Sequence, residues 1–232
     1  MLSGPGGATI PFQIYQDAGH TQPWGSATFL VFGTVPTITV IPDLSGKAST
    51  TQTLYAQISA PQTTAPGTYS STFANESFIW GLNLLSCAGV TVGTLVSPAA
   101  FTFTANVTAN CGLTATNMAF GNVGLLTQPL SAQNQITVLC TATTPYTLGL
   151  NNGLNGASPG ARQMANGTNL VTYAIYMDSG HSQLWGSSGP SSVQSSAGTG
   201  GNQYFNGYGQ VPAQSTPTPG PYSDTIVATL TY

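Results

Sequence analysis

The sequence predicts an all-β protein of two sandwich domains, and three observations support this prediction. Many short runs rich in Val, Ile, Thr and Phe are separated by turns that contain Gly or Pro. No stretch shows a 3.6-residue apolar stripe with helix caps, so almost no helix is expected. A block of residues near the N-terminus recurs near the C-terminus, which indicates a duplicated domain.

The repeat holds at two constant offsets. At an offset of 161, the matching residues are Tyr15, Asp17, Gly19, His20, Gln22, Trp24, Gly25 and Ser26 against Tyr176, Asp178, Gly180, His181, Gln183, Trp185, Gly186 and Ser187. At an offset of 153, they are Tyr55, Gln57, Ala60, Pro66, Gly67, Tyr69 and Ser70 against Tyr208, Gln210, Ala213, Pro219, Gly220, Tyr222 and Ser223. The loop between the two blocks is therefore eight residues longer in the first copy.

The duplication is unequal, and it predicts domains at 1–97 and 98–232. Met1 aligns with residue 162, so the first copy has no counterpart of residues 101–161. Half of a small β-domain leaves a large apolar face uncovered. We therefore expect a natural chain that begins upstream of Met1, although a first domain that folds without its front half is the alternative.

In the first domain, alternating or β-branched segments predict the strands. The expected strand ranges are 10–15, 29–41, 54–60 and 69–84, the second being one long strand or a hairpin broken near Gly33 and Pro36. Turns are expected at 17–26 and 65–68 because both contain Gly and Pro.

In the second domain, residues 101–111 alternate most clearly and are expected to open the domain as a half-buried strand. Further strands are expected at 135–142, 145–150, 171–177, 208–214 and 222–232, with a short piece at 118–121, a loop at 151–160 and a flexible loop at 187–206. Short strands joined by Gly and Pro turns indicate an immunoglobulin-like β-sandwich in each domain.

The composition excludes several classes of partner. Only 3% of the residues are charged, against about 25% in ordinary globular proteins. Lys47 and Arg162 are the only basic residues, so binding to nucleic acid or to an anionic membrane surface is not expected. The 41% hydrophobic content and net charge of −3 argue against disorder. A weakly charged surface suits an exported protein that packs into an assembly.

The three cysteines are Cys87, Cys111 and Cys140. Cys111 and Cys140 lie on two strands expected to be neighbours, which predicts a disulfide between them. Cys87 is then the odd cysteine, which suggests a missing partner and again points to a lost front half of the first domain. Three buried reduced thiols are the alternative.

Residues 101–232 resemble the spore coat protein U family, which includes the pilins of archaic (Csu-type) chaperone–usher pili. The resemblance lies in Val107 to Cys111, Phe120-Gly121, Cys140-Thr141, Pro145 to Leu150, Arg162 to Met164, Tyr173 to Tyr176 with Asp178, Trp185-Gly186, Tyr208 to Ala213, Gly220, Tyr222 to Thr225 and Thr231-Tyr232. The first domain matches over about residues 10–73 and lacks an aspartate equivalent to Asp224.

The resemblance implies a secreted, non-enzymatic subunit with a periplasmic chaperone, an outer-membrane usher and a neighbouring pilin subunit as partners. It implies an incomplete second sandwich, completed by a donor strand, and a two-domain tip adhesin for surface attachment and biofilm formation. The residues expected to line the donor-strand and chaperone groove are Phe103, Ala105, Val107, Ile226, Ala228, Leu230 and Tyr232. Because the chain stops at Tyr232, no further strand is expected to cover that edge.

The Asp-x-Gly-His pairs, Asp17/His20 and Asp178/His181, are the only candidates for acid–base or metal chemistry. Two ligands make a poor metal site, and no nucleophile recurs beside them, so structural turns are expected. No cofactor is expected, because no Gly-rich phosphate loop precedes a helix. Trp24 and Trp185 are expected in the cores, with ligand binding as the alternative.

The most apolar run is Phe29-Leu30-Val31-Phe32 with Val35, Ile38, Val40 and Ile41, and it lies in the loop that is longer in the first copy. It is either a buried strand or a hairpin that carries hydrophobic residues to a surface-binding tip. The tip interpretation assigns attachment to Phe29, Leu30, Phe32 and Val35. A lectin-like carbohydrate-binding module, with Trp24 or Trp80 as contact residues, and a spore or cell-surface coat protein are the alternative functions.

Overall fold

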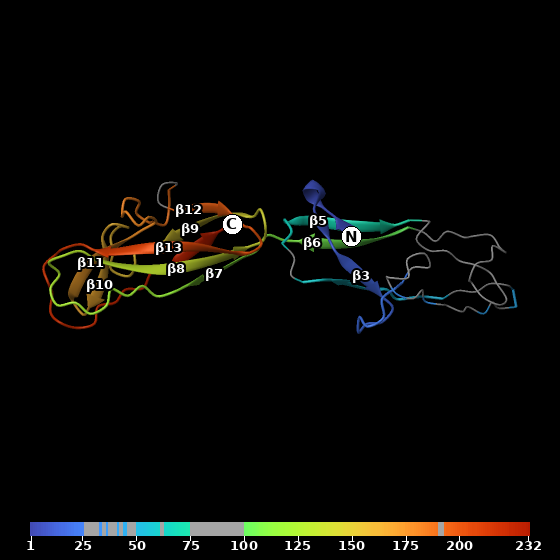
Figure 1. Ribbon diagram of the computed structural model, residues 1–232, viewed down its shortest axis with the longest axis horizontal. Coiled ribbons are helices and arrows are strands. Elements are labelled where there is room, and N and C mark those ends of the chain that lie inside the picture. Colours follow the sequence, from blue (N-terminus) through green and yellow to red (C-terminus); the bar gives the residue numbers. More distant parts are fainter. Residues whose placement is uncertain are drawn as a thin grey trace. The chain divides into compact units, whose positions relative to one another are not determined.

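The computed structural model describes residues 1–25, 33, 36, 41, 44–45, 50–60, 63–74, 100–189 and 193–232. The chain divides into two compact units. Unit 1 consists of Met1–Gln62 and Gly67–Val107, and unit 2 of Thr63–Pro66 and Thr108–Tyr232. Both are built from antiparallel strands, which confirms the predicted all-β class (Figure 1).

Unit 1 contains a four-stranded sheet and a two-stranded ribbon. The sheet has the order β2-β1-β5-β6, and its strands are β1 (Leu2–Ser3), β2 (Thr9–Ile10), β5 (Gly67–Phe73) and β6 (Phe101–Val107). The ribbon pairs β3 (Phe12–Tyr15) with β4 (Tyr55–Ile58). A single 3-10 turn, η1 (Pro5–Gly7), connects β1 to β2. Figure 1 shows β5 and β6 side by side, as their register requires.

The core of unit 1 is small, with Leu2, Ile10 and Tyr69 buried at its centre. Strand β6 covers this core with alternate residues, since Phe103, Ala105 and Val107 pack against it. The alternation of apolar and polar residues in this strand is therefore satisfied within unit 1.

The placement of β6 corrects the sequence-based domain assignment. Residues 101–111 were expected to open the second domain, but β6 pairs with β5 along its whole length, from Gly67 opposite Val107 to Phe73 opposite Phe101. The boundary between the units therefore follows Val107 rather than residue 97. The edge of β5 that faces away from β1 needs a partner, and the alternating strand supplies it.

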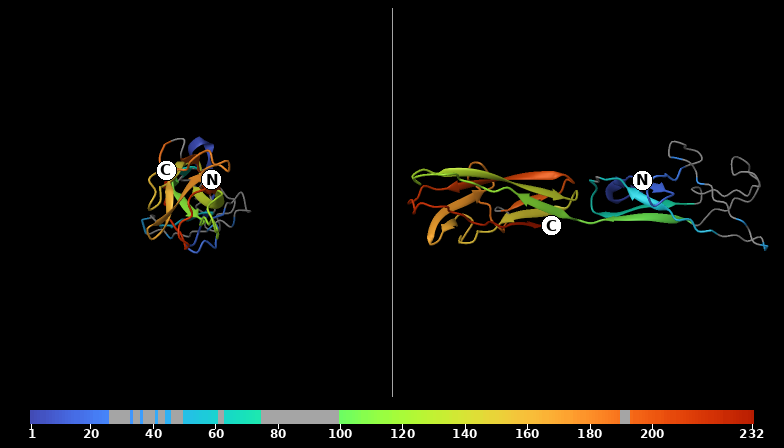
Figure 2. Two further views of the ribbon diagram at one scale, coloured as in Figure 1. Left: turned by 90° about the vertical axis from the view of Figure 1, so that its left-hand side faces the viewer. Right: turned by 90° about the horizontal axis from the view of Figure 1, so that it is seen from below.

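Unit 2 contains two sheets that enclose one core. The larger sheet has the order β10-β11-β13-β8-β7, and its strands are β10 (Arg162–Asn166), β11 (Asn169–Tyr176), β13 (Asn202–Val211), β8 (Leu130–Cys140) and β7 (Cys111–Ala115). The smaller sheet has the order β12-β9-β14, with β12 (Gln194–Ala197), β9 (Pro145–Leu150) and β14 (Ala228–Thr231). Figure 2 shows these strands from two further directions.

Residues from both sheets meet in the core of unit 2. Ile136 and Val138 of β8 face Leu148 and Leu150 of β9, and all four are at most 3% exposed. Trp185 is completely buried among them, and its Nε1–H donates to the Leu148 carbonyl at 3.0 Å. The expectation that Trp185 is a core residue therefore agrees with its burial.

The structure differs from the predicted elements of unit 2 in four places. Strands β7 and β10 lie where no strand was expected, and β12 with the first residues of β13 lies inside 187–206, which was expected to be a flexible loop. Between 222 and 232, regular strand is confined to β14. Strand β12 and the first residues of β13 consist largely of Ser, Asn and Gln, so their pairing depends on neighbouring strands rather than on propensity.

The structure confirms the duplication in atomic detail. The Trp24 N–H donates to the Ile14 carbonyl at 2.8 Å, and the Trp185 N–H donates to the Ile175 carbonyl at the same distance. His20 and His181 both adopt a φ of 55°. Equal sequence blocks therefore fold into equal local structures.

Several expectations fall on residues outside the described ranges. These are the surface-binding residues Phe29, Leu30, Phe32 and Val35, the unpaired Cys87, and Trp80. They stay predictions.

Candidate functional site

Unit 2 contains a cavity of about 570 Å³. One wall is the segment 115–120, which follows β7, and the other is the segment 222–228, which leads into β14. Side chains of the core form the floor between them, and these are Ile136, Leu150, Met164, Tyr173 and Ile175. The cavity therefore lies between two segments that are distant in sequence, with mainly apolar side chains between them.

The wall formed by 222–228 is bonded to the rest of unit 2 along one side. Ser223 and Ala165 of β10 exchange two backbone hydrogen bonds of 2.8 and 3.2 Å. Four residues later, the Val227 N–H donates to Asn151 Oδ1 at 2.9 Å, and the Val227 carbonyl accepts from the Asn151 N–H at 3.0 Å. Ser223 and Val227 thus direct their backbone groups away from the cavity.

The other side of this wall carries the alternate residues. In an extended chain, the N–H and C=O groups of successive residues point to opposite sides. The backbone groups of Tyr222, Asp224 and Ile226 therefore point toward the cavity. Within the described chain, no strand pairs with the wall on that side. An unpaired strand edge beside an apolar floor is a template for strand addition.

A polar network holds the Asp224 carboxylate in the wall. Its Oδ2 accepts from the Tyr173 hydroxyl at 2.7 Å, and its Oδ1 accepts from the N–H groups of Leu154 and Thr225, both at 2.8 Å. Burial, followed by the hydrogen bond to Asp224, raises the pKa of Tyr173, so the phenol stays protonated and keeps donating. The negative charge of Asp224 is therefore satisfied from inside unit 2.

The structure brings together only some of the residues predicted to line the groove. Ile226 and Ala228 line the cavity, and Leu230 packs against the core of unit 2, whereas Tyr232 is 57% exposed. The other three predicted residues, Phe103, Ala105 and Val107, belong to β6 and to the core of unit 1.

The assignment of these three β6 residues to the groove is therefore wrong. The alternation of apolar and polar residues correctly indicates that one face of this strand is buried. It does not indicate which domain's core that face packs against. The wall opposite 222–228 is instead the segment 115–120. The sequence predicts only a short piece at 118–121 in this region. Its small and polar residues carried no periodic signal.

The two Asp-x-Gly-His segments form the same turn. Asp178 accepts hydrogen bonds from the Gln183 N–H at 2.7 Å and from the N–H and hydroxyl of Ser182 at 2.9–3.1 Å. These bonds, that of Gln183 foremost, lower the pKa of Asp178. His181 stacks edge-on against Tyr176, with ring centroids 5.1 Å apart, and its Nδ1 lies 3.2 Å from Gln210 Nε2. The carboxylate organises the turn and does not orient the imidazole.

We expect Asp178→Ala to open this turn and His181→Gln to leave it closed. Hydrogen exchange at the amides of Ser182 and Gln183 measures this. In Asp178→Ala, these amides should exchange roughly tenfold faster than in the parent chain. In His181→Gln, they should exchange at nearly the parent rate. The pKa of Asp178 is lower in the folded state than in the unfolded state. The Asp178 carboxylate therefore stabilises the fold fully above the ordinary carboxyl pKa, and this stabilisation is lost as the pH falls through the lowered pKa. Loss of a hydrolytic or metal-binding activity in His181→Gln would contradict the structural role.

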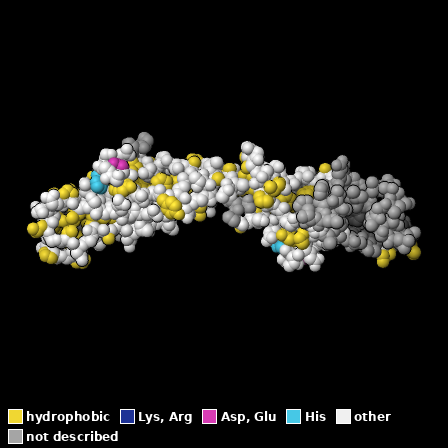
Figure 3. Space-filling view, in the orientation of Figure 1, with side chains coloured by type: hydrophobic (Ala, Val, Ile, Leu, Met, Phe, Trp, Pro, Cys, Tyr) yellow, Lys and Arg dark blue, Asp and Glu magenta, His cyan; other side chains and the backbone are white. Residues whose placement is uncertain are grey.

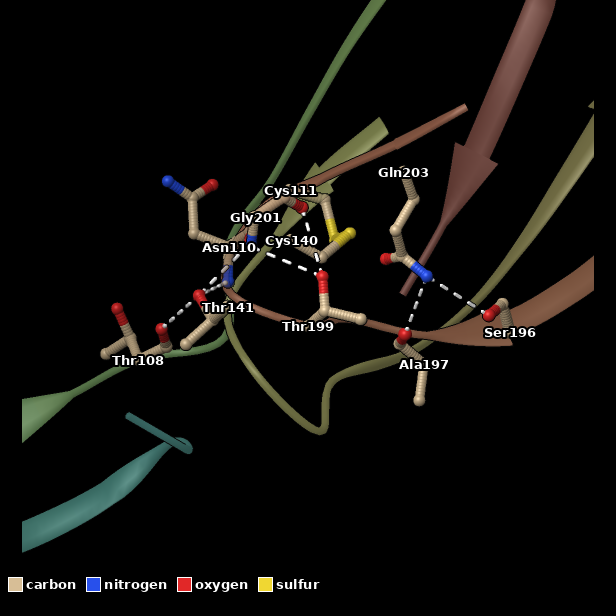
Figure 4. Close-up of a disulfide and its surroundings, with 10 residues drawn as sticks. All are labelled: Thr108, Asn110, Cys111, Cys140, Thr141, Ser196, Ala197, Thr199, Gly201 and Gln203. Carbon is tan, nitrogen blue, oxygen red and sulfur yellow. Dashed lines mark hydrogen bonds between the residues drawn. A yellow bond between two sulfur atoms is a disulfide. The ribbon is translucent and has the colours of Figure 1, made fainter. Parts of the chain in front are cut away.

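The disulfide between Cys111 and Cys140 is confirmed. It joins the facing residues of β7 and β8, which are paired in register. Figure 4 shows its surroundings, where the Thr141 hydroxyl bridges the carbonyls of Thr108 and Asn110 at 3.3 and 3.1 Å. The bridge and these bonds anchor the start of β7, and with it the segment that continues into one cavity wall.

The described surface is almost free of charge. The face shown in Figure 3 displays His and acidic side chains but no basic one among the described residues, in keeping with the complete burial of Arg162. In the described part of the chain, no three His, Cys, Asp or Glu side chains cluster as metal ligands. Among the same residues, no helix is long and apolar enough to cross a membrane.

Comparisons with known proteins agree with this geometry. The chain is similar, at 18% identity and a TM-score of 0.59, to the crystal structure of the CsuC–CsuE chaperone–tip adhesion subunit pre-assembly complex from the archaic chaperone–usher Csu pili of Acinetobacter baumannii. The match covers 100% of this chain and 80% of the matched chain, and it shows a shared fold. No curated protein matches the chain.

The family assignment rests on a separate comparison. The family model described as Spore Coat Protein U domain matches residues 1–75 and 97–229, which is most of the chain. The matched ranges include the repeated blocks of both units and both walls of the cavity. The chain therefore belongs to the Spore Coat Protein U domain family.

Proposed function

We propose that the protein is a structural subunit of an archaic chaperone–usher pilus, assembled by strand addition to unit 2. The observation that carries this proposal is the unpaired edge of 222–228 beside the cavity. A strand placed there would gain a ladder of backbone hydrogen bonds with Tyr222, Asp224 and Ile226. Each apolar side chain that it buries contributes roughly 1.5–3 kcal/mol, enough to hold subunits together without covalent bonds.

The proposed partners follow from the same edge. A periplasmic chaperone supplies the missing strand first, and a neighbouring pilin subunit replaces it after passage through an outer-membrane usher. The fold similarity to a chaperone–tip adhesion subunit complex supports this route. The final location is a pilus on the cell surface, reached through the periplasm, and the subunit is not an enzyme.

Within the pilus we assign the protein to the tip, as an adhesin for surface attachment and biofilm formation. The support is the presence of two units and the likeness over the whole chain to a structure that contains a tip adhesion subunit. Unit 1 would then carry the surface-binding end, with Phe29, Leu30, Phe32 and Val35 as its proposed contact residues. Replacing Phe29 and Phe32 by Ser should reduce attachment to hydrophobic surfaces without reducing secretion.

Co-expression tests the assembly proposal. The full chain expressed alone in a bacterial periplasm should aggregate or be degraded, because the edge and the apolar floor stay uncovered. Co-expression with an archaic-type periplasmic chaperone should yield a soluble one-to-one complex. A stable, soluble monomer obtained without a chaperone would contradict the open edge.

A glycan array tests the alternative of a carbohydrate-binding module. Trp24, which lies in the turn that folds back onto β3, is half-buried and is the described aromatic for this alternative. Binding to defined glycans that is lost in Trp24→Ala, with secretion unchanged, would favour the module over adhesion through apolar contacts.

A further inference from the structure

The duplication allows one unit to be used as a template for the other. Tyr69 and Ser70 of β5 correspond to Tyr222 and Ser223 in the cavity wall. The glycine that precedes each pair by two residues has a similar positive φ, 148° for Gly67 and 156° for Gly220. Strand β5 is therefore the counterpart, in unit 1, of the wall that borders the cavity in unit 2.

The two walls also use the same side for their internal partner. Ser70 pairs with Ser3 of β1, and the corresponding Ser223 pairs with Ala165 of β10. The sheet order β2-β1-β5-β6 places β6 on the opposite side of β5. Strand β6 thus fills, in unit 1, the position that the cavity leaves open in unit 2.

The order of side-chain sizes on β6 follows from what faces them. The antiparallel register sets Phe103 opposite Ser71 and Ala105 opposite Tyr69, while Phe101 and Val107 lie opposite Phe73 and Gly67. Residues directly opposite have Cβ atoms about 4.5–5.5 Å apart. Because the Tyr69 ring is completely buried, only a small residue fits beside it. The small Ser71 leaves room for a Phe.

The same constraints apply in unit 2. Tyr222 lines the cavity, and its hydroxyl donates to the Thr218 carbonyl at 2.7 Å, which holds the ring in place. A residue facing Tyr222 must therefore be small. Asp224 stands where unit 1 has Ser71, but its carboxylate already accepts three hydrogen bonds from inside unit 2. An incoming strand accordingly needs no cation at this position.

We propose that the cavity of unit 2 selects its strand by the order of large and small side chains along it, called the size order below. The strand is a segment of another pilus subunit and runs antiparallel to 220–226. Its inward-facing residues occupy alternate positions. Counted from the N-terminus of the strand, the first two are bulky and apolar and face Ile226 and Asp224. The third is no larger than Ala and faces Tyr222, and the fourth is a branched residue that faces Gly220. This inference rests on the proposed function, because it specifies the sequence of the strand that assembly supplies.

Grafted strands test the size order in the full chain. The chain is extended after Tyr232 by a flexible Gly/Ser linker, long enough to return beside β14, and by a copy of the β6 sequence Phe-Thr-Phe-Thr-Ala-Asn-Val. A second version carries Ala105→Trp in the copy only, at the position that faces Tyr222. The matched control carries Asn106→Trp in the copy only, which places the same ring on the outward face. The measurement is the hydrogen exchange of the Tyr222, Asp224 and Ile226 amides.

We expect the unaltered copy and the Asn106→Trp copy to slow this exchange by roughly 100-fold, and the Ala105→Trp copy to give little protection. Equal protection by all three copies would overturn the size order and leave strand addition standing. Protection by the unaltered copy alone would also overturn the size order. The added Trp ring would then prevent binding at either position, whether or not it faces Tyr222. Absence of protection by every copy would overturn both the size order and the proposed function.

Discussion

Replacing Arg162 by Met is expected to destabilise unit 2 by about 3–5 kcal/mol. The guanidinium is completely buried and donates to four backbone carbonyls, those of Leu150, Asn151, Pro159 and Trp185, at 2.6–3.4 Å. Met fills a similar volume but has no donor, so these acceptors lose their partner.

Two effects oppose each other in this variant. The guanidinium loses hydration because it is completely buried, which lowers the pKa of Arg162, and Met removes that cost. The orphaned carbonyls outweigh it, because each unsatisfied acceptor costs about 1–3 kcal/mol. Two of them, on Leu150 and Trp185, belong to residues at the centre of the core.

Chemical denaturation of the subunit in complex with its chaperone, or of a strand-extended form, measures the loss. Arg162→Lys is the matched control, since it keeps the charge and one donor group but not the planar fork of donors. It should fall between the parent and Arg162→Met. Unchanged stability in Arg162→Met would show that the carbonyl network contributes little.

Removing the disulfide is the second large effect. The double variant Cys111→Ala/Cys140→Ala should lose about 3.6 kcal/mol, because the bridge closes a loop with a sequence separation of 29 and restricts the unfolded chain. This corresponds to a fall of roughly 10 °C in the thermal midpoint. The expected consequence in the cell is a lower yield of subunit, since β7 leads into one wall of the cavity.

Calorimetry of a strand-extended form of the chain, with and without a reducing agent, provides the comparison. Reduction should reproduce the effect of the double variant, and the double variant should not respond to the reducing agent. A midpoint that stays the same after reduction, with the thiols shown to be free, would contradict a stabilising bridge.

Local chemistry made several features predictable from the sequence alone. The all-β class follows from short β-branched runs between Gly and Pro turns, and the duplication from residues that recur at constant offsets. The Asp178 turn was predicted because Asp, Gly and polar residues close together satisfy one another locally, as its hydrogen bonds show. The cysteine pair was predicted because both residues lie on strands expected to be neighbours, and the structure pairs them.

The partner of each strand was decided only by the tertiary structure. Alternation in 101–107 indicates that β6 has one buried face, but the core of unit 1, rather than that of unit 2, buries that face. The wall 115–120 and strand β10 gave no periodic signal, because their burial depends on neighbours distant in sequence. Local sequence determines which residues can turn or face a core, whereas pairing between distant strands depends on which edges remain open once the rest of the sheet has formed.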